Sequence, residues 1–540
     1  MRRLAPRIGI VLSMLLAFLT GPFFSSPEST LHGVWAVKDC RVVTLAGPPL
    51  EKGTVIIRDG LIESVGPAVA IPADAEVIDG SGLTVYPGLI DALNQSLLKL
   101  PEVKFDQTKL MTGQYTDEDR GLTPERRAFE YFDLTKASLE KHHSFGLTVV
   151  QVLPSRGLLT GQAAVFCLSG QDKNTTVVLR DHLLGIAFSP AGFNVYPNSL
   201  MGSVAFLRQE LSDAVYGAAR EARWKKDPKG NVRSAYHPRH AVLSEFASGR
   251  KPVVFLCGNQ YDLRRALEIS AEFKLDALLA DLGSESWRLL PELKKAGARV
   301  LCPVDFKVPG TSIHAQRGKA KREAAEKELY VKNPARLAEA GIPFALVSLG
   351  ADDPKSLMEG VRKAVENGLP AEKALEALTS APARLLGLER ALGSVEKGKI
   401  ANLVLVEGDL LAAEPKIHTV FADGKKFEVK KAKAEAGAAP EVNVGGKWEL
   451  DIQGAGLKVT VDFLQEGGAL SGKMTTPFGV FDFTGGTVSG KTVYFEVNLS
   501  VGGQDIDLYF SAAVADDRMT GSVVQGTQGA AEFTAKRIPG

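Results

Sequence analysis

Two patterns of apolar positions divide the chain. Between residues 88 and 394, short apolar runs alternate with amphipathic stretches. The apolar runs cover residues 148–153, 252–256, 277–280, 299–303 and 343–348, and the amphipathic stretches include residues 262–273 and 286–296. Strands and helices that alternate at this pitch predict βα units around a parallel sheet.

The flanking regions follow a different rule. Residues 35–87 and 395–429 form short apolar runs broken by turn dipeptides such as Asp59-Gly60 and Asp79-Gly80, which predicts β-structure. Residues 430–442 are rich in Ala and Lys without apolar periodicity, as is typical of a linker. Residues 443–540 contain runs of strict alternation, such as residues 457–463, and predict an antiparallel sandwich or small barrel.

The N-terminal residues indicate the compartment. Arg2, Arg3 and Arg7 precede an apolar run over residues 8–19, and this arrangement predicts a secretory signal within residues 1–26. The run is short for a membrane span, which needs about 20 apolar residues. We therefore expect an exported protein, periplasmic or extracellular. The alternative is a signal that stays uncleaved and anchors the protein in the membrane through residues 8–24.

Composition excludes two classes of protein. The chain has 64 Lys and Arg against 63 Asp and Glu, a net charge of +1, whereas nucleic-acid binders are usually basic. We therefore expect no nucleic-acid partner. Four cysteines in 540 residues are too few for a disulfide scaffold. Cys167, Cys257 and Cys302 each lie in an apolar run, which predicts small buried side chains.

Two sequence blocks carry a family resemblance. The first runs through residues 53–62 (GTVIIRDGLI) to residues 86–91 (YPGLID). The second covers residues 374–387 (ALEALTSAPARLLG) and 393–404 (GSVEKGKIANLV). Together they resemble the amidohydrolase superfamily, in its imidazolonepropionase-like and dihydroorotase-like branch. The resemblance implies a (β/α)₈ barrel over residues 88–394 and a composite β-sandwich from residues 35–87 and 395–429.

The resemblance also implies a chemistry, and here the chain departs from the family. Members hydrolyse C–N bonds with a water that a bound metal activates. The metal is held by a His-x-His on the first barrel strand, by histidines later in the chain and by an aspartate of strand 8. The matching positions here are Leu93, Gln95, Leu256 and Leu349. A leucine has no lone pair, and a glutamine amide is a poor zinc ligand. We therefore predict that no metal or other cofactor is bound at this site.

Other residues remain as candidates for a non-standard site. A three-residue shift of the last match would bring Asp352 to the aspartate position. His182 follows Asp181, and this is the one His/Asp pair expected near a strand end. His314 lies on the long loop expected after the strand at residues 299–303, where barrel active-site loops are found. His237 and His240 lie in a polar stretch that predicts a surface loop.

Three functions stay open at this stage. The favoured one is an exported homologue without catalysis, which binds a peptide or cyclic amide as a small ligand or pairs with an active relative. The second is a working hydrolase for C–N bonds, in dipeptides or non-peptide substrates, with a zinc-like ion in a non-standard site. The third assigns the function to residues 443–540 and makes the barrel a scaffold.

Overall fold

The computed structural model describes residues 33–101, 109, 112–188, 195–233, 235–306, 328–350, 353–412, 415–429, 441–452, 457–477, 479–501, 504–525 and 530–538. The chain divides into two compact units, Met1–Val429 and Lys430–Gly540. We call them the first and the second unit. The expected signal or anchor and most of the expected linker lie outside the described residues.

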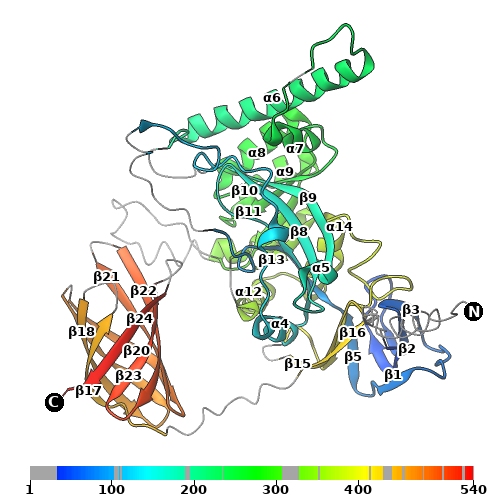
Figure 1. Cartoon of the computed structure of the whole chain (residues 1–540). Helices are drawn as coiled ribbons and strands as arrows, with labels where there is room; N and C mark the ends of the chain where they lie inside the picture. The colour runs from blue at the N-terminus through cyan, green and yellow to red at the C-terminus, as the bar shows by residue number, and fades with distance from the viewer. Residues whose placement is uncertain are drawn as a thin grey trace, which may run out of the picture. The chain divides into compact units, whose positions relative to one another are not determined.

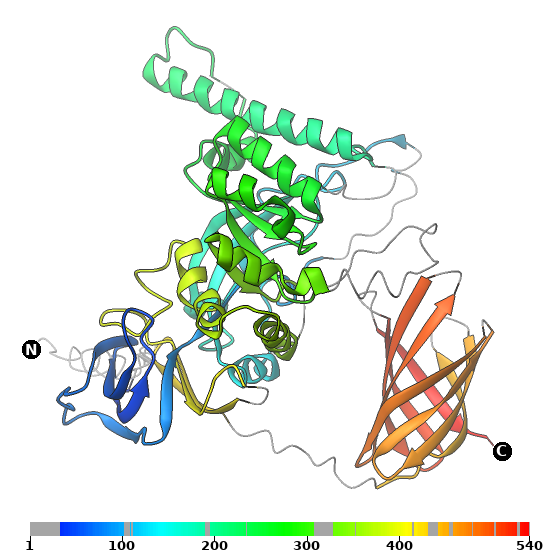
Figure 2. The same ribbon diagram turned by 180° about the vertical axis from the view of Figure 1, so that it is seen from behind.

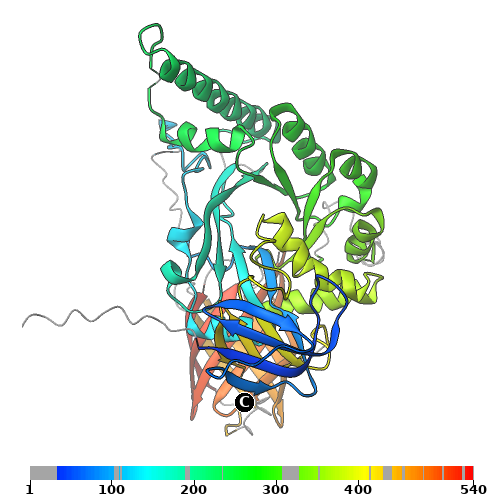
Figure 3. The ribbon, with the colours of Figure 1, turned by 90° about the vertical axis from the view of Figure 1, so that its right-hand side faces the viewer.

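One sheet of the first unit is built from both ends of its chain (Figure 3, blue and yellow). The strands are β1 (Trp35–Val42), β2 (Leu50–Arg58), β3 (Leu61–Gly66), β4 (Glu76–Asp79), β5 (Leu83–Pro87), β14 (Leu403–Glu407), β15 (Lys416–Ala422) and β16 (Lys425–Glu428). They follow the order β16-β15-β14-β5-β1-β2-β3, and β4 pairs with β1. β14 runs antiparallel to β5, with Leu403 opposite Pro87. Val55 and Leu403 therefore share one apolar core.

The second sheet of the first unit forms a nearly closed barrel (Figure 1). Its strands are β6 (Leu89–Asn94), β7 (Leu147–Val152), β8 (Leu159–Cys167), β9 (Val177–Ala187), β10 (Val253–Cys257), β11 (Ala277–Asp281), β12 (Arg299–Pro303) and β13 (Phe344–Val347). Neighbouring strands are parallel, except that β8 runs antiparallel to both β7 and β9. A parallel bridge between Asn94 and Leu349 joins the last strand to the first. The expected fold class is confirmed, with one reversed strand that the repeating βα pattern did not predict.

Helices cover the outer face of this barrel. They are α3 (Ala128–Tyr131), α4 (Lys136–His143), α5 (Lys173–Thr176), α8 (Gln260–Phe273), η1 (Ser286–Leu289), α9 (Leu290–Ala296), α11 (Asn333–Ala340), α12 (Pro354–Glu366) and α13 (Ala371–Ala377). A further helix, α14 (Ser380–Leu385), instead adds Ala383 and Leu385 to the apolar cluster inside the barrel. In α12, Asp353 accepts a hydrogen bond from the Lys355 amide and caps the helix, as short acidic side chains commonly do. Its residues Leu357, Val361 and Ala364 are buried at helical spacing, so one apolar stripe packs on the barrel.

Two further helices form a separate projection of the first unit. α6 (Leu200–Lys226) is 27 residues long, and its buried residues end at Ala214. Its second half therefore extends away from the barrel strands (Figure 2). α7 (Pro238–Ala247) follows, with Pro238 in the first helical turn, where a missing N–H costs nothing. The expectation of a surface loop around His237 and His240 is wrong, because His240 lies on α7 and His237 is its N-terminal flanking residue.

The second unit is a closed antiparallel barrel of eight consecutive strands. They are β17 (Gly446–Ile452), β18 (Leu457–Glu466), β19 (Ala469–Thr476), β20 (Gly479–Ser489), β21 (Thr492–Val501), β22 (Gln504–Ala515), β23 (Arg518–Gln525) and β24 (Ala530–Arg537). Along β17, Trp448 and Leu450 are buried and point inward, and they alternate with exposed Lys447 and Glu449. The Phe463 and Phe495 rings meet edge to face at 5.0 Å in the core. Across the described part of the chain, no helix is long and apolar enough to cross a membrane.

Candidate functional site

The barrel interior follows from the alternation of side chains along its strands. On β10, Val254 and Leu256 belong to the inner apolar cluster, whereas Val253, Phe255 and Cys257 belong to the cluster under the helices. Because successive strand residues face opposite sides, Leu256 is the last inward residue of β10. The carboxyl ends of barrel strands carry the active sites of such folds. We call the inward residues at these strand ends the mouth.

The residues that the sequence motifs match to the family's metal ligands lie near the carboxyl ends of the strands. Leu93, Leu256 and Leu349 lie in the same inner cluster. The Leu349 amide donates to the Leu93 carbonyl at 2.9 Å, and the Gln95 amide donates to the Leu349 carbonyl at 2.7 Å. Leu349 adopts a left-handed backbone with φ 59°, which is uncommon for a residue other than glycine. Leu93, Leu349 and Gln95 are therefore neighbours through their backbones, and Leu256 belongs to the same apolar cluster as the two leucines.

A buried polar group holds the first and last strands of this barrel together. The Asp91 carboxylate accepts hydrogen bonds from the Ser348 amide at 3.1 Å and from the Ser348 hydroxyl. The Asn94 amide donates to Asp91 at 3.2 Å and to the Ser348 hydroxyl at 3.0 Å. Burial raises the pKa of Asp91, and these hydrogen bonds oppose that shift. Asp91 is thus used to close the barrel.

His182 lies within β9 and not at its end. Its Nε2 contacts the Gln151 side-chain oxygen at 2.8 Å, and Gln151 in turn donates to the Ala92 carbonyl. Burial lowers the pKa of His182 to about 4, so the ring is neutral near pH 7. The neighbouring Asp181 instead pairs with Arg127. The side chains of Asp181 and His182 therefore have different partners.

A second buried carboxylate, missed by the sequence motifs, ends β11. Asp281 accepts from the Glu285 amide at 2.9 Å, the Ser286 amide at 2.8 Å and the Asn333 side chain at 3.0 Å. Leu278 and Ala280 face inward, so Asp281 faces the helices and not the mouth. Burial raises its pKa. It therefore holds the turn after β11 and is unavailable at the mouth.

The described residues at the mouth do not supply the ligands of a family-type metal site. His314 and Asp352 lie outside the described residues. Among the residues that are described, no three His, Cys, Asp or Glu side chains gather as metal ligands would. Cys257 and Cys302 are buried and free, and burial raises the pKa of each thiol well above its usual range. A thiolate, the form that binds metals, is therefore disfavoured at both.

Comparison with known proteins agrees with this fold. The sequence model of the amidohydrolase family matches residues 325–433. A solved structure of an amidohydrolase from Thermotoga maritima MSB8 has a TM-score of 0.60 and 22% identity, over 73% of this chain and 99% of that chain. A 5-methylthioadenosine/S-adenosylhomocysteine deaminase from Moorella thermoacetica is 36% identical over 67 residues. That match spans 12% of this chain and only 16% of the deaminase.

Residues 325–433 therefore resemble the amidohydrolase family in sequence, and over 73% of its length the chain shares the fold of a solved amidohydrolase.

Proposed function

We propose that this chain is an amidohydrolase homologue that does not use the metal centre of its family and binds a ligand at the mouth. The observation that carries the proposal is that Leu93, Leu256 and Leu349, near the ends of their strands, all belong to or pack against the apolar cluster inside the barrel. Three leucines leave a divalent ion without the ligands that a catalytic zinc site requires. The expected secretory signal makes this an exported protein in the same proposal.

The chemistry of the mouth favours a peptide or a cyclic amide with an apolar side chain. Leu349 and Leu282 are partly exposed members of the inner cluster, so they can pack against an apolar group. Gln95 is also partly exposed, and its side-chain amide can donate to and accept from another amide. An apolar wall with a few polar groups is the usual composition of a small-molecule site.

Metal content tests the first half of the proposal. The protein, purified without chelator in the presence of zinc, should contain clearly substoichiometric metal by inductively coupled plasma mass spectrometry. The variant Leu93→His/Gln95→His/Leu256→His/Leu349→Asp should gain zinc, because it restores the family donors. The variant with only the first two changes should not, since two imidazoles fall short of three protein ligands. Stoichiometric zinc in the unmodified protein, lost in His314→Ala or Asp352→Asn, would instead favour a working hydrolase.

Ligand binding tests the second half. We expect cyclo(Leu-Leu) to raise the melting temperature, and cyclo(Gly-Gly), which lacks apolar side chains, to leave it unchanged. The variant Leu349→Gln should abolish the shift by removing an apolar contact at the mouth. Leu61→Gln is the matched control, because Leu61 is exposed on β3. An equal shift with both variants would place the ligand elsewhere.

A further inference from the structure

A cleft between α6 and α7 lies outside the proposed mouth site and is independent of it. Its volume is about 570 Å³. Small residues of α6, such as Ala214, Gly217 and Ala218, leave room on one side. His237, His240 and Ser244 line the other side. A volume of this size suits an organic molecule better than a simple ion.

The rim of the cleft is basic. Between Arg220 and Arg239 the chain has seven Lys or Arg and two Asp or Glu, although its net charge is only +1. Lys225, Arg233 and Arg250 are exposed and line the cleft. Glu221 also lines it and lies 3.8 Å from Lys225, so it offsets one of these charges. The two arginines remain to attract an anion.

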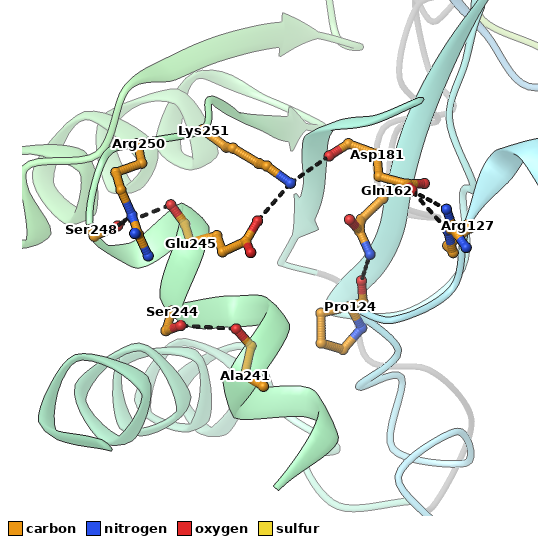
Figure 4. Close-up of polar contacts among 10 residues, drawn as sticks. All are labelled: Pro124, Arg127, Gln162, Asp181, Ala241, Ser244, Glu245, Ser248, Arg250 and Lys251. Atoms are coloured by element: carbon orange, nitrogen blue, oxygen red, sulfur yellow. Dashed lines mark hydrogen bonds and ion pairs between the residues drawn. The ribbon is translucent and has the colours of Figure 1, made fainter. Parts of the chain in front are cut away.

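The wall that α7 provides is fixed in place from two sides. Lys251, just beyond the helix, pairs with Glu245 at 2.6 Å and donates to the Asp181 carbonyl of β9 at 3.1 Å (Figure 4). On the side of α6, the buried Glu210 lies 2.8 Å from Arg239 and 3.2 Å from His240. A wall held in this way needs little ordering when a ligand binds.

Flat ring surfaces accompany the positive charge. The His237 and His240 rings stack at 4.5 Å, and the Tyr236 side chain is 81% exposed beside them in the lining. The Arg233 guanidinium lies over the Trp224 ring at 4.7 Å. Aromatic rings and guanidinium planes both accept a planar ring by stacking.

We infer that the α6–α7 cleft binds an organic phosphate that also carries a planar ring, as a nucleoside monophosphate does. Arg233 and Arg250 recognise the phosphate, since a guanidinium fork matches phosphate oxygens in pairs. The exposed ring of Tyr236 and the stacked histidines receive the ring. The small residues of α6 provide the space in which both parts fit.

Isothermal titration calorimetry of the full chain with AMP as the probe tests this inference. AMP should bind, and the double variant Arg233→Gln/Arg250→Gln should weaken it by roughly tenfold or more through loss of charge-assisted contacts. The matched control is Arg220→Gln/Lys229→Gln, which removes the same charge from the same region outside the cleft lining. It should change the affinity much less.

Two further probes separate the parts of the ligand. Adenosine, without the phosphate, and inorganic phosphate, without the ring, should each bind more weakly than AMP. Equal weakening by both double variants would mean that the general field of the projection attracts the anion, and would overturn the inference. Equal binding of inorganic phosphate and AMP, or no binding of AMP, would overturn it as well.

Discussion

The two barrels of this chain have eight strands each, but their outer faces differ. In the first unit all five residues of β10 are buried, because helices cover the outside of the sheet. In the second unit β17 alternates, with Trp448 and Leu450 buried and Lys447 and Glu449 exposed. A continuous apolar run thus marks a strand covered on both faces, and strict alternation marks a strand with one wet face.

The interiors differ as well. The first barrel contains buried polar groups, among them Asp91, Gln151 and Asp281. In the second, every buried side chain within the described residues is apolar. Polar groups survive burial only when they are hydrogen-bonded, so the first barrel depends on contacts that titrate or that one substitution can break.

Acid should separate the two units most strongly. Burial lowers the pKa of His143 and of His182 to about 4, against an ordinary value of 6.5. Between these two pH values the unfolded chain binds more protons than the folded unit does. The first unit therefore loses stability as the pH falls from about 6.5 to 4. The loss is about 3 kcal/mol for each histidine. Residues 441–540 contain no histidine, and hydrogen exchange there should change far less.

A single substitution isolates this effect. Burial raises the pKa of Asp91 and of Asp281, so the folded unit binds protons at these carboxyls at a higher pH than the unfolded chain does. In acid they therefore favour the folded state, whereas the histidines favour the unfolded one. His143→Gln removes one titrating ring and keeps a donor for the Leu168 carbonyl, which His143 contacts at 2.7 Å. Its unfolding free energy, measured by hydrogen exchange, should depend less on pH than that of the wild type. If the unfolding free energy of the variant depended on pH as strongly as that of the wild type, the prediction would be wrong.

Leu346→Thr tests the covered outer face of the first barrel. Leu346 lies on β13, is fully buried and packs in the cluster under the helices, although it points away from the barrel interior. Losing its apolar volume and burying a hydroxyl should cost about 3 kcal/mol. Urea unfolding followed by hydrogen exchange in β13 measures the loss. A cost below about 1 kcal/mol would mean that the helices cover this face loosely.

Ser348→Ala tests the polar closure of the same barrel. The change removes the hydroxyl that donates to the buried Asp91. An unsatisfied buried acceptor costs about 1–3 kcal/mol, although the Ser348 amide and Asn94 still contact Asp91. Ser144→Ala is the matched control, because the Ser144 hydroxyl bonds only at the surface. Equal effects of the two changes would show that this contact does not stabilise the barrel.

Local pattern predicted most of the strands. The run at residues 299–303 is β12 itself, and the runs near residues 148, 252, 277 and 343 differ from their strands by a residue or so at either end. The reversed direction of strand β8 was not predicted, because an apolar run that is buried on both faces does not indicate which way its strand runs. The length of α6 was not predicted either, since its buried residues end at Ala214 and its second half has no apolar periodicity.

Motif spacing matched Leu93, Gln95, Leu256 and Leu349 to the family's ligand positions, because each lies at a fixed distance from a family signature, and this match stays a prediction. It did not find that Ser348 contacts Asp91, since these residues are 257 positions apart in the chain. Nor did it find the α6–α7 cleft, whose two arginines come from separate loops and line one cleft only when α7 folds against α6. Contacts of this kind depend on tertiary packing, which a single sequence does not display.

The smallest change in stability should come from a substitution on the solvent-exposed outer face of the second barrel. Leu464 lies on β18 and is 62% exposed, so Leu464→Thr removes little buried area and keeps a residue that favours strands. The unfolding free energy should change by less than about 0.5 kcal/mol, as at most surface positions. This is the same substitution as Leu346→Thr, again at an outward position of a barrel strand. Hydrogen exchange in β18 and its neighbour β19 measures the change, and a loss comparable to that of Leu346→Thr would show that a partner covers this face.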